Sequence, residues 1–331
     1  MPRNSGVEQE TPTARGSRFR LAGGGRSLGL AAAALLLFFA LSLHSPELRS
    51  AYSISVISRQ IAFFSLLGLG QAVCIVVGGM NLSLGAIGAI CTVALGLLLD
   101  KCGLSGWLAV PITLAVGAGA GLLNGLLITR LKIDSFIVTL SMMFIYMGLR
   151  SGISGGAPYR VPDSFCFIGQ EALGLVPYMF ITAMLVLTAF GLMFRHTRLG
   201  RGLLAVGGNA EASRLSGIRA DAMIVWANAL SGFLAALAAI LWASKLATAA
   251  PQTGDDWLII SFAVAIIGGT GLTGGAISAT GILMGATIFM LIKHGLVVIK
   301  ANDHYANSFQ GLLILLTIVG DRARELYGKR R

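Results

Sequence analysis

The sequence predicts an all-α, polytopic membrane protein of about ten transmembrane helices, with broken helices and an internal two-fold repeat. Of its 331 residues, 55% are hydrophobic and only 12% are charged, whereas soluble proteins average about 25% charged residues. Apolar runs long enough to cross a bilayer recur along the chain. A glycine-rich phrase is written twice, as GGMNLSLGAI at 78–87 and GGTGLTGGAI at 268–277, each time between two apolar runs.

Apolar runs of roughly 17–25 residues are the expected spans. The first run is not followed by a small-residue cleavage site, so it is expected to be a retained helix. Two runs, 83–100 and 256–270, are short or interrupted by glycine. The expected spans are 27–43, 54–78, 83–100, 107–129, 134–150, 174–194, 223–245, 256–270, 276–299 and 306–320.

Charge sets the expected orientation and domain organisation. With the N-terminus in the cytoplasm, most Lys and Arg residues fall in cytoplasmic segments, which satisfies the positive-inside rule. The transmembrane domain, 27–320, is then flanked by a polar tail at 1–26, expected to be disordered, and a basic tail at 321–331. Both tails are expected in the cytoplasm. The net charge of +11 is thereby an orientation signal, and no nucleic-acid partner is expected.

Glycine spacing predicts a tight helix–helix contact in the fourth span. Gly117, Gly121 and Gly125 are four residues apart and therefore share one helix face. Asn124, beside them, either bonds to a neighbouring helix or lines a pore. A kink is the alternative interpretation of the glycines.

Several chemistries have no motif in the chain. No phosphate-binding G-x-x-x-x-G-K-[ST] pattern occurs, so the chain is not expected to hydrolyse ATP. No Cys/His cluster suggests a metal site, and no catalytic residue or cofactor of this chain is expected. Few charges lie deep within the spans, which disfavours a proton-coupled mechanism but leaves a secondary transporter as an alternative.

The long polar loop at about 195–222 contains a predicted short helix at 210–216. Asn209 is a good N-cap, Glu211 lies in the first turn, Arg214 lies near the end, and Gly217 supplies a left-handed stop. A helix of this length is unstable alone in water. It suits docking into a groove of another protein, although an ordinary solvated loop helix is the alternative.

This loop resembles the coupling segment of ATP-binding-cassette (ABC) importer permeases of the ribose/sugar type, which are related to branched-chain amino-acid permeases. The segments 78–87, 135–149 and 265–286 are also similar to that family, and the resemblance covers nearly all of 50–320. The matching loop positions are His196, Thr197, Gly200, Arg201, Ala205, Gly207, Gly208, Asn209, Ala212, Gly217 and Ile218.

The resemblance implies a type II ABC-importer-like fold in the bacterial inner membrane, importing a sugar or sugar-like solute. It implies a second permease subunit, identical or homologous, a separate ATPase subunit that holds ATP and Mg, and a periplasmic substrate-binding protein. Membrane lipid surrounds the spans. The implied ATPase-coupling residues are Gly207, Gly208, Asn209, Glu211, Ala212, Arg214 and Gly217.

The sequence departs from the family pattern at three usually acidic positions, which here are Asn81, Leu258 and Ile260. The solute differs, or the chain is one half of a heterodimer, or those acids are dispensable. Import of branched-chain amino acids or nucleosides, and a stand-alone secondary transporter or channel, are the alternative functions.

The doubled phrase and the polar residues within spans supply the candidate pore positions. Paired glycines are expected to end one helix at each break, and a Ser or Thr, at 83 or 273, to cap the next. Three tryptophans near span ends, at 226, 242 and 257, are expected to anchor the membrane interface. The candidate pore or broken-helix residues are Asn81, Ser83, Asn124, Asn228, Thr270 and Thr273.

Overall fold

The computed structural model describes residues 24–44, 46–271 and 273–298, and five positions between 308 and 319. Helices dominate, and the only strands among these residues form two short antiparallel pairs, β1 with β4 and β2 with β3. The elements are α1 Gly24–His44, η1 Pro46–Arg49, α2 Ala51–Val76, α3 Leu84–Gly96, η2 Leu97–Lys101, α4 Gly106–Leu131, α5 Ser135–Ser154, β1 Tyr159–Arg160, η3 Asp163–Phe165, α6 Phe167–Gln170, β2 Ala172–Leu173, β3 Val176–Pro177, α7 Tyr178–His196, α8 Arg198–Gly208, α9 Ala210–Leu215, α10 Ala220–Leu246, β4 Thr248–Ala249, α11 Trp257–Ile267 and α12 Ala279–Val298.

The bundle is that of a polytopic membrane protein. Seven helices within the described residues are long and apolar enough to cross a membrane, and α1 and α11 add shorter apolar helices. The predicted span 306–320 lies mostly outside the described residues, so the number ten remains a prediction. The predicted span 256–270 is wrong in length, because α11 ends at Ile267 and its 11 residues extend only about 16 Å.

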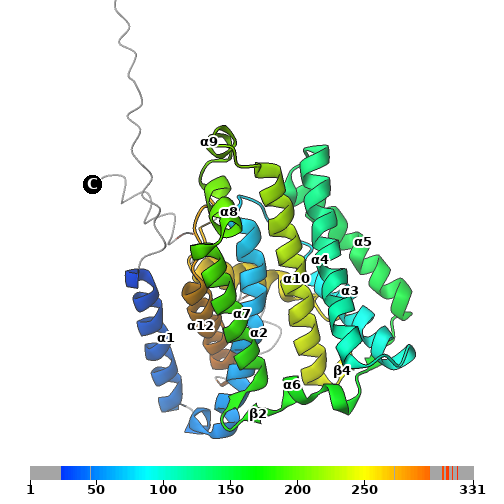
Figure 1. Cartoon of the computed structure of the whole chain (residues 1–331). Coiled ribbons are helices and arrows are strands. Elements are labelled where there is room, and N and C mark those ends of the chain that lie inside the picture. Colours follow the sequence, from blue (N-terminus) through cyan, green and yellow to red (C-terminus); the bar gives the residue numbers. More distant parts are fainter. Residues whose placement is uncertain are drawn as a thin grey trace, which may run out of the picture.

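The helix α2 lies at the centre of the bundle and is buried along most of its length. It packs against α7, α10, α11 and α12, while α4 and α5 lie beyond α10 and α3 (Figure 1). One end of the bundle carries α8 and α9, and the opposite end carries α6, β2 and β4 (Figure 1). We refer to these as the α9 end and the α6 end.

The predicted glycine seam is confirmed as the contact between α4 and α10. A Cβ atom on Gly121 would overlap the Asn228 carbonyl group, and a Cβ on Gly117 would meet Gly232. Gly125 lies against Val225 in the same row. Hydrogen in place of a side chain therefore lets the two backbones touch, as in many membrane helix pairs.

Two of the three expected interface tryptophans are instead packed inward. Trp257 is 2% exposed and meets Phe63 edge-on, and Trp242 stacks on the same ring. Only Trp226, which is 52% exposed, fits interface anchoring. Its position near a predicted span end does not place Trp257 at the membrane interface, because α11 is short and begins inside the bundle.

We expect Gly121→Ala to lower the free energy of unfolding by about 1–3 kcal/mol, the usual range for overpacking a tight contact. The new methyl group must push α4 away from the α10 backbone. Gly119→Ala is the matched control, since a Cβ there meets nothing within 4 Å. Unfolding in detergent would measure both, and equal stabilities for the two variants would contradict the assigned contact.

Candidate functional site

The first copy of the glycine-rich phrase forms a partly buried break between α2 and α3. Gly78 adopts φ +80°, which ends α2 as expected from the paired glycines. The chain then crosses the interior without helical hydrogen bonds until α3 begins at Leu84. Asn81 and Ser83, in the middle of the break, are fully buried.

Every backbone N–H from Val77 to Ser83 has a hydrogen-bond acceptor. The first three bond back to carbonyls of α2, and Ser83 N–H bonds to the Asn81 side chain. Two more N–H groups bond to side chains of α5. Met80 N–H donates to Ser135 Oγ at 3.1 Å, and Leu82 N–H donates to Thr139 Oγ1 at 3.2 Å.

The remaining N–H group of the break belongs to Asn81 and is held by α2. With its amide oriented to satisfy both partners, Gln71 Nε2 donates to the Asn81 carbonyl at 3.0 Å, and its Oε1 accepts from the Asn81 N–H at 3.3 Å. An unpaired buried N–H or C=O is costly inside a membrane protein. The supporting side chains therefore make an irregular backbone possible here.

A second layer of bonds joins the break to α4, α5 and α10. Asn81 Nδ2 donates to Ser231 Oγ at 2.9 Å, and Ser83 Oγ donates to Asn81 Oδ1 at 2.8 Å. Asn124 Nδ2 donates to Ser83 Oγ at 2.7 Å, and Tyr146 Oη donates to Asn124 Oδ1 at 3.2 Å. We call these five side chains the break network.

The break network changes the interpretation of two candidates. Ser83 occupies the N-cap position of α3, but its hydroxyl makes no capping bond, because it accepts from Asn124 Nδ2 and donates to Asn81 Oδ1 instead. Asn124 bonds to neighbouring elements, which was one of its two predicted roles. Asn228 lies apart from the network and donates to the Ile224 carbonyl of its own helix at 3.0 Å.

The second copy forms the break between α11 and α12. Gly269 has φ +87° and ends α11 as expected. Thr273 does not cap the next helix, because the positive φ angles of Gly274 and Gly275 prolong the loop. Ser278 takes that role, accepting from Gly281 N–H at 3.1 Å, while Thr270 is buried and Thr273 is exposed.

The predicted helix at 210–216 is confirmed as α9, one residue shorter. Asn209 Oδ1 accepts from Ala212 N–H at 2.9 Å, and Gly217 follows with φ +83°. The helix α8 before it was missed, although Thr197 caps it by accepting from Gly200 N–H at 3.0 Å. The helical spacing of Leu199, Leu203 and Val206, at i, i+4 and i+7, was the available signal.

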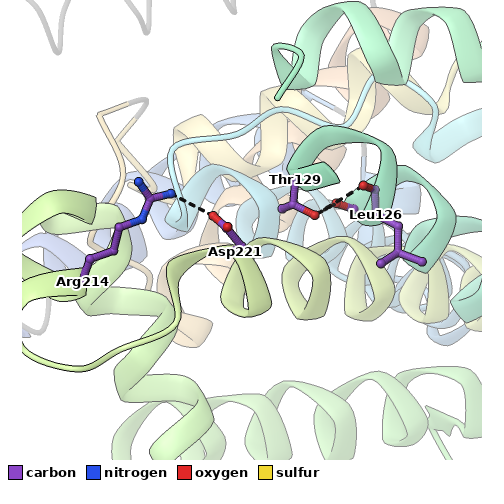
Figure 2. A network of polar contacts seen from close by, with 5 residues as sticks. Leu126, Thr129, Arg214 and Asp221 are labelled. Atoms are coloured by element: carbon purple, nitrogen blue, oxygen red, sulfur yellow. Dashed lines mark hydrogen bonds and ion pairs between the residues drawn. The ribbon is translucent and has the colours of Figure 1, made fainter. Parts of the chain in front are cut away.

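The α9 helix presents polar side chains and one leucine at the end of the bundle. Arg214 pairs with Asp221 at 2.8 Å across exposed space, which ties α9 to the first turn of α10 (Figure 2). Glu211 and Ala212 are also exposed. Leu215 is 87% exposed, and sequence reasoning missed it. The sequence signal for its exposure was a lone leucine in a short helix of small and polar residues.

Three backbones meet where α8 touches both breaks. Gly275 N–H, in the second break, donates to the Val76 carbonyl at the end of α2 at 2.9 Å. A Cβ on Gly207 of α8 would overlap that same carbonyl oxygen. Gly208 lies against Gly275. We call Val76, Gly207 and Gly275 the glycine junction, and it joins the α8–α9 element to both copies of the doubled phrase.

The family described as branched-chain amino acid transport system / permease component matches residues 53–318. The chain belongs to this permease family. It is 30% identical to the ribose import permease protein of Escherichia coli over 88% of this chain and 92% of that protein. It is 31% identical to the fructose import permease protein of Bifidobacterium longum over 85% and 81%.

A further relative has a different cargo in its name. The chain is 28% identical to the autoinducer 2 import system permease protein of Klebsiella pneumoniae, over 88% of this chain and 89% of that protein. No solved structure matches the chain. The permease family is thus shown by sequence, and the geometry of the breaks comes from this structure.

We expect Asn81→Ala to destabilise the protein by about 1–3 kcal/mol for each buried partner that loses its bond. The Ser83 N–H, the Ser83 hydroxyl and the Ser231 hydroxyl all contact this amide. Ser141→Ala is the control, because that exposed hydroxyl bonds only to its own helix. Thermal unfolding in detergent would compare them, and an Asn81→Ala protein as stable as the control would refute the structural role.

Proposed function

We propose that the chain is the membrane-spanning subunit of an ABC importer that forms the path for a sugar or sugar-like solute. The observation that carries this proposal is the α8–α9 element, which stands at one end of the bundle and touches both helix breaks. A stand-alone carrier or channel has no need of such an element. The names of the ribose and fructose import relatives favour sugars over branched-chain amino acids.

The partners follow from this assignment. A separate ATPase subunit, carrying ATP and Mg, docks on the α9 end, which we place in the cytoplasm with both termini. A periplasmic binding protein delivers solute at the α6 end, and a second permease subunit completes the pore. The residues that contact the ATPase include Asn209, Glu211 and Arg214, with Leu215 as the apolar anchor. The chain itself supplies no catalytic residue.

The doubled phrase supports a repeated architecture with ten spans in 27–320, counting 306–320 as the last. Both copies lie at the same end, and they contact each other at Gly275 and Val76. In the sequence, polar residues 1–26 and basic residues 321–331 flank the spans. Transporters built from repeats often place discontinuous helices beside the substrate path. Here the ATPase displaces α8, and α8 in turn moves the two breaks.

We expect Leu215→Asp to abolish co-purification with the ATPase and ATP-dependent uptake in proteoliposomes. The substitution puts a charge where an 87%-exposed leucine would enter a partner's groove. Leu175→Asp is the matched control for co-purification with the ATPase, since that leucine is 62% exposed but lies in the turn between β2 and β3, at the α6 end. Uptake by the wild-type chain without any ATPase would contradict the proposed function itself.

We expect Gly207→Ala to uncouple ATP hydrolysis from uptake while the ATPase remains bound. The added methyl group must separate α8 from the Val76 carbonyl. Gly208→Ala tests the same helix end without that clash, because nothing lies within 4 Å of its Cβ position. Uptake per ATP hydrolysed would distinguish them. Equal ratios in the two variants would mean that the glycine junction transmits nothing.

A further inference from the structure

Three cationic side chains gather near the α6 end, one each from α2, α10 and α12. Arg59 donates through Nη2 to the Gln170 carbonyl, and Gln170 Nε2 donates to the Lys245 carbonyl at 3.2 Å. Lys245 Nζ donates to Gln60 Oε1 at 3.1 Å. Arg59 and Lys293 both lie within electrostatic range of the Lys245 ammonium group. Each of the three cations is half-buried.

An aromatic row connects two of these cations. Lys245 Nζ lies 4.7 Å from the centroid of Trp242, which stacks on Phe63 at 4.4 Å. Phe63 meets Phe64 at 5.8 Å, and Lys293 Nζ lies 5.7 Å from the Phe64 centroid. The ring faces partly offset the loss of water around the ammonium groups. We call these five side chains, together with Arg59, the cationic recess: Arg59, Phe63, Phe64, Trp242, Lys245 and Lys293.

No carboxylate among the described residues forms an ion pair with a cation of the recess. Ion pairs among the described residues engage Arg150, Arg160 and Arg214, and none of the three recess cations. Arg59 Nε is buried without a hydrogen-bond partner in the described part of the chain.

The surrounding helices do not make up this deficit. α2, α11 and α12 contain no Asp or Glu, and the single acid of α10, Asp221, lies in its first turn at the α9 end. Asp255, just before α11, is already paired with Arg150 at 2.7 Å. Partly buried cations without a counter-ion are costly in an apolar bundle and are candidates for binding an anion. An anion from outside the chain would relieve both the repulsion and the unpaired donor.

We propose that the cationic recess binds a solute that carries a carboxylate or phosphate on a sugar-like body. The three cations would hold the anionic group, Gln60 would bond to a hydroxyl, and Trp242, which is partly exposed while Phe63 and Phe64 are buried, would face the apolar side of the sugar ring. This inference rests on the proposed function and narrows its substrate class to sugar acids and phosphorylated sugars. The phosphate of an anionic lipid headgroup shares this chemistry and is tested separately.

Tryptophan fluorescence of the full chain in phosphatidylcholine nanodiscs tests the recess directly. At constant ionic strength we expect gluconate and glucose 6-phosphate to change the emission, with gluconate binding about 10-fold or more tighter than neutral glucose, the gain from one or two charged hydrogen bonds. Trp242→Phe should remove the signal. Equal affinity for glucose and gluconate, or no response to either, would overturn the inference.

Variants that remove single charges test whether gluconate binds in the cationic recess. We expect Lys245→Gln and Lys293→Gln each to weaken gluconate binding about 10-fold, for the loss of one charged contact. Lys293→Arg should retain it, and Lys132→Gln, on an exposed lysine at the far end of α4, should change nothing. Unchanged affinity in both Lys→Gln variants would overturn the inference.

Two further measurements distinguish this inference from lipid binding and from the proposed importer function. Phosphatidylglycerol in the nanodisc that saturates the signal, and that gluconate does not displace, would assign the recess to lipid and overturn the inference. ATP-driven uptake of glucose with no binding of gluconate would also overturn it, yet leave the proposed function standing. Gluconate binding together with ATP-independent uptake would support the recess and contradict the ABC-importer function.

Discussion

The backbone of the first helix break needs hydrogen-bond partners inside an apolar bundle, and the rest of the structure depends on meeting that need. Asn81 and Ser83 at the centre of the break are fully buried, so side chains and not water must supply their partners. Gln71, Ser135 and Thr139 bond to the backbone, and the break network around Asn81 locks the arrangement to α4, α5 and α10. The break is consequently a defined structural element with fixed neighbours on four helices.

Direct contact between backbones is the second constraint on the structure, and glycine makes that contact possible. In the glycine junction, α8 lies on the Val76 carbonyl that also accepts the Gly275 N–H of the second break. A shift of α8 therefore acts on both breaks at once. On the other side of the bundle, the seam of Gly117 and Gly121 holds α4 on α10, which carries Ser231 of the break network. We infer that the coupling element and the two breaks form one mechanical unit.

Local signals in the sequence predicted much of this arrangement. The cap and stop residues around α9, the paired glycines of both breaks and the glycine seam all act within a few residues, so each could be inferred from the chain alone. The break network could not, because Asn81 meets Ser231 across 150 positions. Asn81, which departs from the family's usual acid, is thus a buried amide with a structural role. The inward position of Trp257 and the exposure of Leu215 likewise depend on tertiary contacts.

The single mechanical unit can be tested most directly by pulsed electron paramagnetic resonance distances in the assembled transporter, with and without ATP. Spin labels at Arg201→Cys and Thr273→Cys would report on α8 and the second break, both exposed positions. A second pair, Arg201→Cys with the exposed Leu36→Cys of α1, would report on α8 against a helix that carries no residue of the break network. We expect ATP to leave the first distance unchanged and to shift the second. A shift of the first distance with the second unchanged would contradict the coupling of α8 to the breaks.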